Sequence, residues 1–237
     1  MSPFRHALLL AALAAAPAGA AAAQGFEGVV TFVNYRQSKD QPDTLVQTTK
    51  GAMLRLDMMG AGEGADHGSV IVDTKTHTMT IIMNKEQRFM TMQMKPPTSL
   101  AKELGDFTLT KTGRSETVAG VRCDVYHGER TEEGGGKKEG EACLAKGVGL
   151  MFGAILASWG SQLPKGSVPA VFQQLEKEDL HVVEAWEIKD GKKSLSTTAV
   201  KIDRKPVSAS VFQPPAGFTE FKMPAGMQGA GAPPSKP

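Results

Sequence analysis

Residues 77–94, HTMTIIMNKEQRFMTMQM, decide how we expect this chain to fold. Side chains alternate in character on both sides of the polar tetrapeptide NKEQ at 84–87. A period of two is typical of β-strands, and a short polar segment between two such strands predicts a hairpin. The stretch therefore predicts two antiparallel strands joined by a four-residue loop.

The loop length sets which side chains share a face of this hairpin, because directly opposed residues on paired strands point the same way. With a loop over 84–87, Met83 faces Arg88, Ile81 faces Met90 and Met79 faces Met92. A shift of one residue would exchange the faces. One face is therefore expected to carry Met79, Ile81, Met83, Met90, Met92 and Met94, and these six residues are the candidate binding surface.

Similar short strands, separated by turn residues, are predicted on both sides of the hairpin. Those from residue 26 to residue 95 follow one another closely, which favours an antiparallel meander over βαβ units. Further strands are expected over 106–113, 115–120, 121–129, 137–145, 180–188 and 193–202. Short helical segments are predicted at 98–105 and within 149–178. The pattern indicates a mainly β, α+β fold.

The chain begins with features of an export signal. A basic start at Arg5 and His6 precedes an apolar run and the small residues Ala21–Ala23, so cleavage is expected after Ala23. The signal peptide does not distinguish the periplasm from full secretion. We therefore divide the chain into a signal peptide (1–23), a single domain (24–221) and a disordered tail rich in Pro, Gly and Ala (222–237).

Charge and hydropathy narrow the range of partners. Loss of Arg5 with the leader leaves 26 basic and 25 acidic residues. This balance gives no electrostatic reason to expect nucleic acid. No apolar run of the mature chain approaches the roughly 20 residues that a membrane-spanning helix requires. Neither a protein partner nor an oligomeric state can be inferred.

The two cysteines, Cys123 and Cys143, predict one structural disulfide. They lie almost symmetrically about the Gly-rich turn 132–138, so a link between two neighbouring strands is geometrically sensible. A redox pair or a metal pair are the alternatives. A catalytic redox pair usually has the close C-x-x-C spacing, which is absent from this sequence.

The order of short motifs resembles a known family. The mature chain resembles the bacterial family known as domain of unknown function 4412, which is similar in turn to the periplasmic lipoprotein-carrier superfamily. That resemblance implies a strongly curved antiparallel sheet, an unclosed barrel, with helices covering its concave face. It implies no activity and no catalytic residue. The motifs that carry it are F-E-G at Phe26, K-G-A-M-L-R-L-D (50–57), V-I-V-D ending at Asp73, L-T-K-T-G (109–113), E-T-V-A-G-V-R-C-D-V-Y (116–126) and V-F-Q-P-P-A-G-F (211–218).

Catalysis is not expected, because the sequence contains no H-E-x-x-H, no G-x-S-x-G and no phosphate-binding Gly loop. The mature chain has four isolated histidines, which are His67, His77, His127 and His181. A triad assembled from distant residues would be visible only in the fold. No catalytic residue, metal ligand or cofactor is assigned.

Three functions remain open for the Met-rich hairpin. Methionine is flexible and polarizable, so it suits both a plastic core and a surface that binds a lipid or another amphiphile. Eight of the 12 methionines lie within 53–94, and soft thioethers select Cu(I). Neighbouring sulfurs on one strand are about 7 Å apart, so copper would need a cross-strand pair such as Met79 and Met92. An envelope interaction protein without a small ligand is the third alternative.

Overall fold

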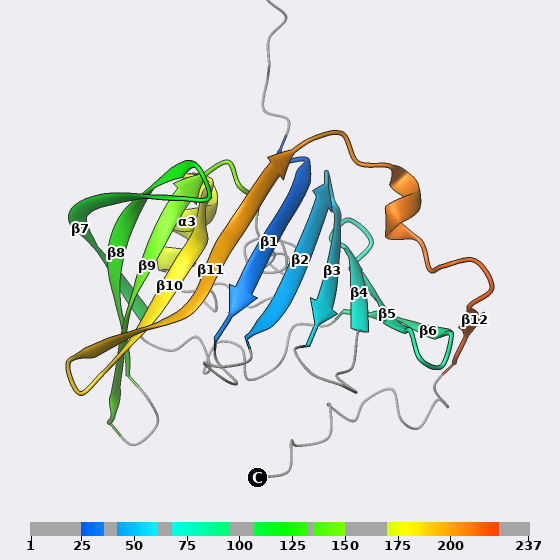
Figure 1. The fold of residues 1–237 in the computed structure, drawn as a ribbon, viewed down its shortest axis with the longest axis horizontal. Helices are drawn as coiled ribbons and strands as arrows, with labels where there is room; N and C mark the ends of the chain where they lie inside the picture. The colour runs from blue at the N-terminus through cyan, green and yellow to red at the C-terminus, as the bar shows by residue number, and fades with distance from the viewer. Residues whose placement is uncertain are drawn as a thin grey trace, which may run out of the picture.

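A computed structural model describes residues 25–35, 42–60, 68–94, 107–131, 135–149 and 170–222. Within these ranges the protein is mainly β, with one α-helix and one short 3-10 helix (Figure 1). The elements are β1 (Gly28–Asn34), β2 (Asp43–Lys50), β3 (Met53–Met59), β4 (Gly68–Asp73), β5 (Thr78–Met83), β6 (Arg88–Gln93), β7 (Phe107–Val118), β8 (Val121–Thr131), β9 (Lys137–Lys146), α3 (Ala170–Lys177), β10 (Leu180–Lys189), β11 (Lys192–Arg204), η1 (Ala209–Phe212) and β12 (Thr219–Glu220).

All of these strands belong to one open sheet, in the order β12-β6-β5-β4-β3-β2-β1-β11-β10-β9-β8-β7. Two antiparallel meanders, β1 to β6 and β7 to β11, are joined where β1 pairs with β11. The predicted meander of the first half is confirmed. Strands β6 and β7 follow one another in the chain but lie near opposite ends of the sheet.

One pair of predicted strands is a single element. Segments 106–113 and 115–120 were expected to be separate, but β7 runs through both of them. The register against β8 shifts between Lys111 and Ser115, and Gly113 between them has φ +80°. A bulge with a left-handed glycine lets the strand bend and resume its pairing, so the glycine that suggested an end marks a bend instead.

The largest buried cluster lies around β1 and β8 to β11 and contains the disulfide. Cys123 and Cys143 are bonded with their Cα atoms 5.4 Å apart, so the predicted pairing is confirmed. Cys143 lies opposite Val125 in the register, and the bond therefore runs diagonally from β9 to β8. Both sulfur-bearing side chains are fully enclosed, which favours a structural role over a redox one.

The first half of the sheet is covered on one face by the C-terminal segment after β11. Val207 and Phe212 of this segment pack with Ile71 of β4 and Ile82 of β5. Lys50 Nζ donates to the Val207 carbonyl over 2.5 Å and also forms an ion pair with Glu27 at 3.0 Å. The segment then reaches the far edge of the sheet, where β12 pairs in parallel with β6.

Helix α3 follows the predicted amphipathic pattern, with Val171, Phe172 and Leu175 half-buried. Phe172 stacks on Phe107 of β7, with ring centroids 5.5 Å apart. Phe107 lies on the side of β7 that faces Gly128, and residues of β8 alternate in direction. The helix therefore packs against the face of β8 that does not carry the disulfide.

Several predictions fall outside the described residues and stay predictions. They are the signal peptide over 1–23, the short helix at 98–105, most of the helical region 149–178 and the tail beyond residue 222. Within the described ranges, no helix is long and apolar enough to cross a membrane.

Candidate functional site

The predicted register of the β5–β6 hairpin is confirmed. Residues 84–87 form the turn, and Met83, Ile81 and Met79 lie opposite Arg88, Met90 and Met92. The structure thus brings all six predicted residues to one face, which we call the Met-rich face. It is defined by Met79, Ile81, Met83, Met90, Met92 and Met94.

The Met-rich face continues without a register shift across five strand pairs to β1. Ile81 lies opposite Val70, which lies opposite Leu56, so their side chains share a face. Sequence reasoning missed this extension because the alternation within each strand does not say which strand it pairs with. The apolar residues that extend the face are Val30, Phe32, Leu45, Leu54, Leu56, Met58, Val70 and Val72, and the register places Gln47 and Thr49 among them.

The side chains of the Met-rich face differ in burial. Met94 is buried against Leu54 and Val72, whereas the other five side chains are half-buried. At the end of the face near the 84–87 turn, Met58 is 47% exposed and lies over Gly68. The opposite face of the same hairpin is different, because Ile82 is only 1% exposed beneath the C-terminal segment.

A single buried polar side chain interrupts this apolar surface among the residues that define and extend it. Gln47 is 1% exposed, and its Nε2 donates to Thr49 Oγ1 at 3.2 Å and to the Gly149 carbonyl at 2.5 Å. A buried amide needs such partners, since an unsatisfied one is strongly destabilising. The Gln47 contact places Gly149 on the same side of the sheet as the Met-rich face.

The edge of the Met-rich face carries a cation and an aromatic ring. Arg88 shares this face with Met83, and its guanidinium lies 5.6 Å from the centre of the Phe221 ring. Phe221 directly follows β12, and its N–H donates to the Phe89 carbonyl at 2.7 Å. Alternation along β12 places the Phe221 ring on the side of Arg88 and Met90.

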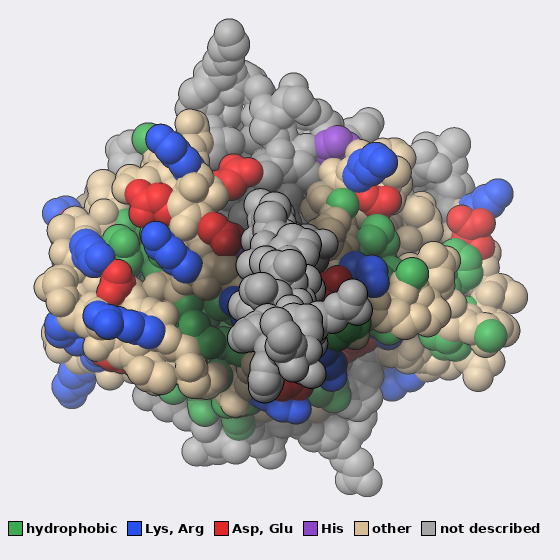
Figure 2. Space-filling view, turned by 90° about the horizontal axis from the view of Figure 1, so that it is seen from above, with side chains coloured by type: hydrophobic (Ala, Val, Ile, Leu, Met, Phe, Trp, Pro, Cys, Tyr) green, Lys and Arg blue, Asp and Glu red, His purple; other side chains and the backbone are tan. Residues whose placement is uncertain are grey.

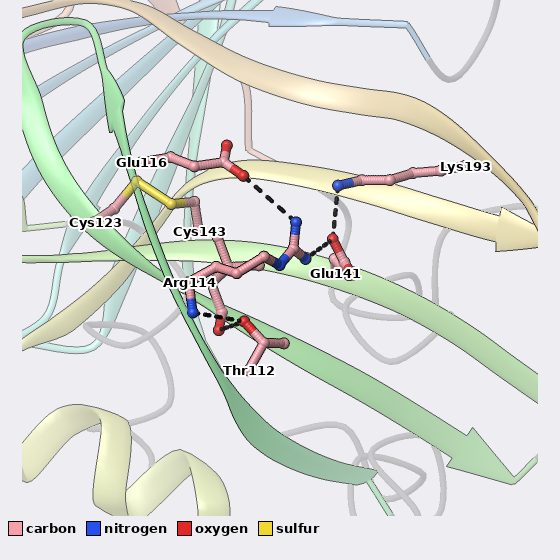
Figure 3. Close-up of polar contacts among 8 residues, drawn as sticks. Thr112, Arg114, Glu116, Cys123, Glu141, Cys143 and Lys193 are labelled. Atoms are coloured by element: carbon pink, nitrogen blue, oxygen red, sulfur yellow. Dashed lines mark hydrogen bonds and ion pairs between the residues drawn. A yellow bond between two sulfur atoms is a disulfide. The ribbon is translucent and has the colours of Figure 1, made fainter.

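A second polar cluster links strands of the other meander (Figure 3). Glu141 on β9 accepts from Arg114 of β7 and from Lys193 of β11, both at 2.6 Å. Lys193 also lies 3.7 Å from the centre of the Trp186 ring. The hydrogen bond from Lys193 and that from Arg114 lower the pKa of Glu141 below its ordinary value of 4.5. Because every charge in the cluster is paired, it links β7, β9 and β11 rather than offering a free reactive group.

The three described histidines are dispersed. His181 Nε2 lies 2.6 Å from Asp179 Oδ1, and His127 lies 3.4 Å from Glu129. His77 occupies a turn with φ +57°. Across the described part of the chain, no three His, Cys, Asp or Glu side chains are grouped as metal ligands would be.

The face of the molecule in Figure 2 carries mixed charge among its described residues. Figure 2 shows Lys and Arg interspersed with Asp and Glu on the side of the molecule that it presents, with apolar side chains visible between them. Binding of nucleic acid usually requires a broad basic patch. The described residues visible in Figure 2 form no such patch.

Comparison with known proteins agrees with the resemblance in the sequence. The family model described as a domain of unknown function, DUF4412, matches residues 26–218. No curated protein matches the chain. The matched region includes every strand from β1 to β11 and the covering segment that contains η1. The chain therefore belongs to the DUF4412 family.

Proposed function

We propose that this protein is an exported, non-catalytic binding protein that holds a lipid or another amphiphilic ligand on the Met-rich face. The observation that carries the proposal is the uninterrupted register from β1 to β6, which aligns apolar side chains from six strands on one face. Five of the six side chains that define the Met-rich face are only half-buried among the described residues. Most of the residues that extend the face toward β1 are buried, so the ligand is placed on the half-buried side chains of the β5–β6 hairpin and on the exposed Met58.

We place the ligand on the concave side of a half-barrel, and two geometric facts support the curvature. First, β7 contacts β11 although three strands separate them in the sheet. In a flat sheet these strands would lie about 19 Å apart. This contact supports a curl at the β7 end of the sheet.

The second fact is the length of the connection between β6 and β7. Ten strand-to-strand steps separate β6 from β7 in the sheet, or about 48 Å if the sheet were flat. Only the 14 residue steps from Gln93 to Phe107 join them, and a fully extended chain of that length spans about 46–50 Å. A curved sheet removes the need for a fully stretched connection, which supports the unclosed barrel that the resemblance implies.

Methionine suits a surface that must accept varied apolar chains. Its side chain is unbranched and polarizable, so it repacks around a ligand at little energetic expense. The hairpin itself offers the contrast, because its other face uses Ile82 and Phe89 against the C-terminal segment. Within this hairpin, Ile82 and Phe89 therefore lie where the protein packs against itself, whereas five of the six residues where we place the ligand are methionines.

The test is purification of the protein, expressed with its own signal peptide, from the periplasm without detergent. Native mass spectrometry and an organic extract of the same sample would then be compared. We expect an intact mass that begins at Gln24, together with a bound mass that passes into the organic phase. A clean ligand-free mass from several growth conditions would count against the proposal, and an uncleaved chain in the cytosol would count against export.

Cu(I) binding is the second candidate function, because Met79 lies directly opposite Met92. Directly opposed residues have their Cβ atoms about 5 Å apart, so both thioethers can reach one soft cation. Anaerobic titration with Cu(I) against a competing chelator tests this candidate. Binding no tighter than micromolar, or binding that survives the double substitution Met79→Leu and Met92→Leu, would exclude it.

A further inference from the structure

The end of the Met-rich face beside the 84–87 turn is both apolar and positively charged. Arg88 shares the face with Met83, and β3 contributes the exposed Met58 to the same row across Gly68. From Arg88 to Met94 the face extends about 20 Å along β6. A cation thus stands at the open end of a long apolar strip whose far end, at Met94, is buried.

No carboxylate of the described residues forms an ion pair with Arg88. Its guanidinium lies over the Phe221 ring instead. Glu220 lies opposite Phe89 in the register, so its side chain points to the other face. A guanidinium held over an aromatic ring keeps N–H donors for a bidentate bond to a carboxylate or phosphate.

We infer that the Met-rich face takes a single-chain amphiphile with an anionic head, which lies at Arg88 while its tail runs toward Met92. This inference rests on the proposed function and specifies its ligand class. Charge complementarity at Arg88 selects the sign of the head, and the half-buried methionines accept the tail. Phe221 holds the guanidinium in place, so the C-terminal segment contributes to recognition as well as to packing.

Three probes with the same dodecyl chain test the inference on the mature protein. Dodecanoate, dodecyl maltoside and dodecyltrimethylammonium would be titrated calorimetrically below their micelle concentrations. We expect dodecanoate to bind more tightly than the neutral probe, and the cationic probe to bind most weakly. For an exposed ion pair the difference at each step is about threefold to tenfold.

Variants of Arg88 separate charge from packing. Arg88→Glu should reverse the order of the charged probes, whereas Arg88→Lys should keep the order with a smaller preference because a lysine cannot form the bidentate bond. Lys189→Glu, an exposed cation at the end of β10, is the matched control and should change neither. Thermal unfolding midpoints of the variants would confirm that each is folded.

The outcomes distinguish this inference from the proposed function beneath it. If none of the three probes binds the wild-type protein, the proposed function fails. If all three bind equally and Arg88→Glu leaves them unchanged, amphiphile binding stands but the anionic head is excluded. If Lys189→Glu has the same effect as Arg88→Glu, net charge rather than the Arg88 site sets the preference, and the inference is overturned.

Discussion

Two alanine substitutions in one hairpin separate a binding surface from a packed core. Ile82→Ala removes a side chain that is 1% exposed against Val207 and Phe212. Met92→Ala removes a half-buried side chain from the opposite face, in the adjacent strand. Both positions lie inside strands, so the effect of alanine on strand propensity is similar and largely cancels in the comparison.

The expected losses of unfolding free energy differ by more than a factor of two. Truncation of a fully buried Ile or Met typically lowers stability by about 2–5 kcal/mol, so we expect about 3 kcal/mol for Ile82→Ala. Since Met92 is half-buried, its loss should be about 1 kcal/mol. With a urea m-value of about 3 kcal/mol/M, the unfolding midpoints should fall by about 1 M and 0.3 M.

The assay pairs urea unfolding with binding of a neutral fluorescent probe such as N-phenylnaphthylamine. Met92→Ala should weaken probe binding severalfold, whereas Ile82→Ala, measured well below its unfolding midpoint, should leave it unchanged. The reasoning is refuted if Met92→Ala destabilises the protein as much as Ile82→Ala and probe binding is unaffected. The Met-rich face would then be packed core.

Three further predictions follow from the described contacts. Replacing Cys123 and Cys143 together by Ala should lower the unfolding free energy by about 3 kcal/mol, from the entropy of a loop of some 20 residues; an unchanged urea midpoint would contradict this. Because the pKa of Glu141 is lowered in the folded state, its contribution is present above pH 4.5 and lost as the pH falls through the folded value. Glu141→Gln should therefore destabilise by about 1 kcal/mol at pH 7 and by much less near pH 3, as thermal unfolding at both pH values would show. Mild peroxide should oxidise Met58 well before the buried Met94; peptide mass spectrometry that found equal rates would refute this order.

Most strands could be predicted from the sequence, because their apolar and polar side chains alternate and most of the loops between them are short. In the β5–β6 hairpin the four-residue loop leaves one register that places all the methionines together, and the structure has that register. The disulfide between Cys123 and Cys143 was predicted from the expected export of the chain and from the short turn that separates the two cysteines. These features depend on residues close together in sequence.

Long-range pairing could not be predicted from the sequence, because the alternation of a strand does not specify its partner. Nothing in β1 indicates that it pairs with β11 across the chain. The C-terminal segment was also missed as a packing element, although Val207, Phe212 and Phe218 gave a sparse apolar signal. Arg88 was placed on the Met-rich face by its register, but its contact with Phe221 depends on β12, which is too short to predict.

The central claim is that an amphiphile occupies the Met-rich face, and photo-crosslinking tests it most directly. A fatty acid that carries a diazirine on its chain would be bound to the mature protein, irradiated and mapped by peptide mass spectrometry. We predict labelling concentrated on residues 77–94 and on β3, and its loss when unlabelled dodecanoate is added. Labelling spread over the exterior, or labelling that unlabelled ligand does not displace, would contradict the account.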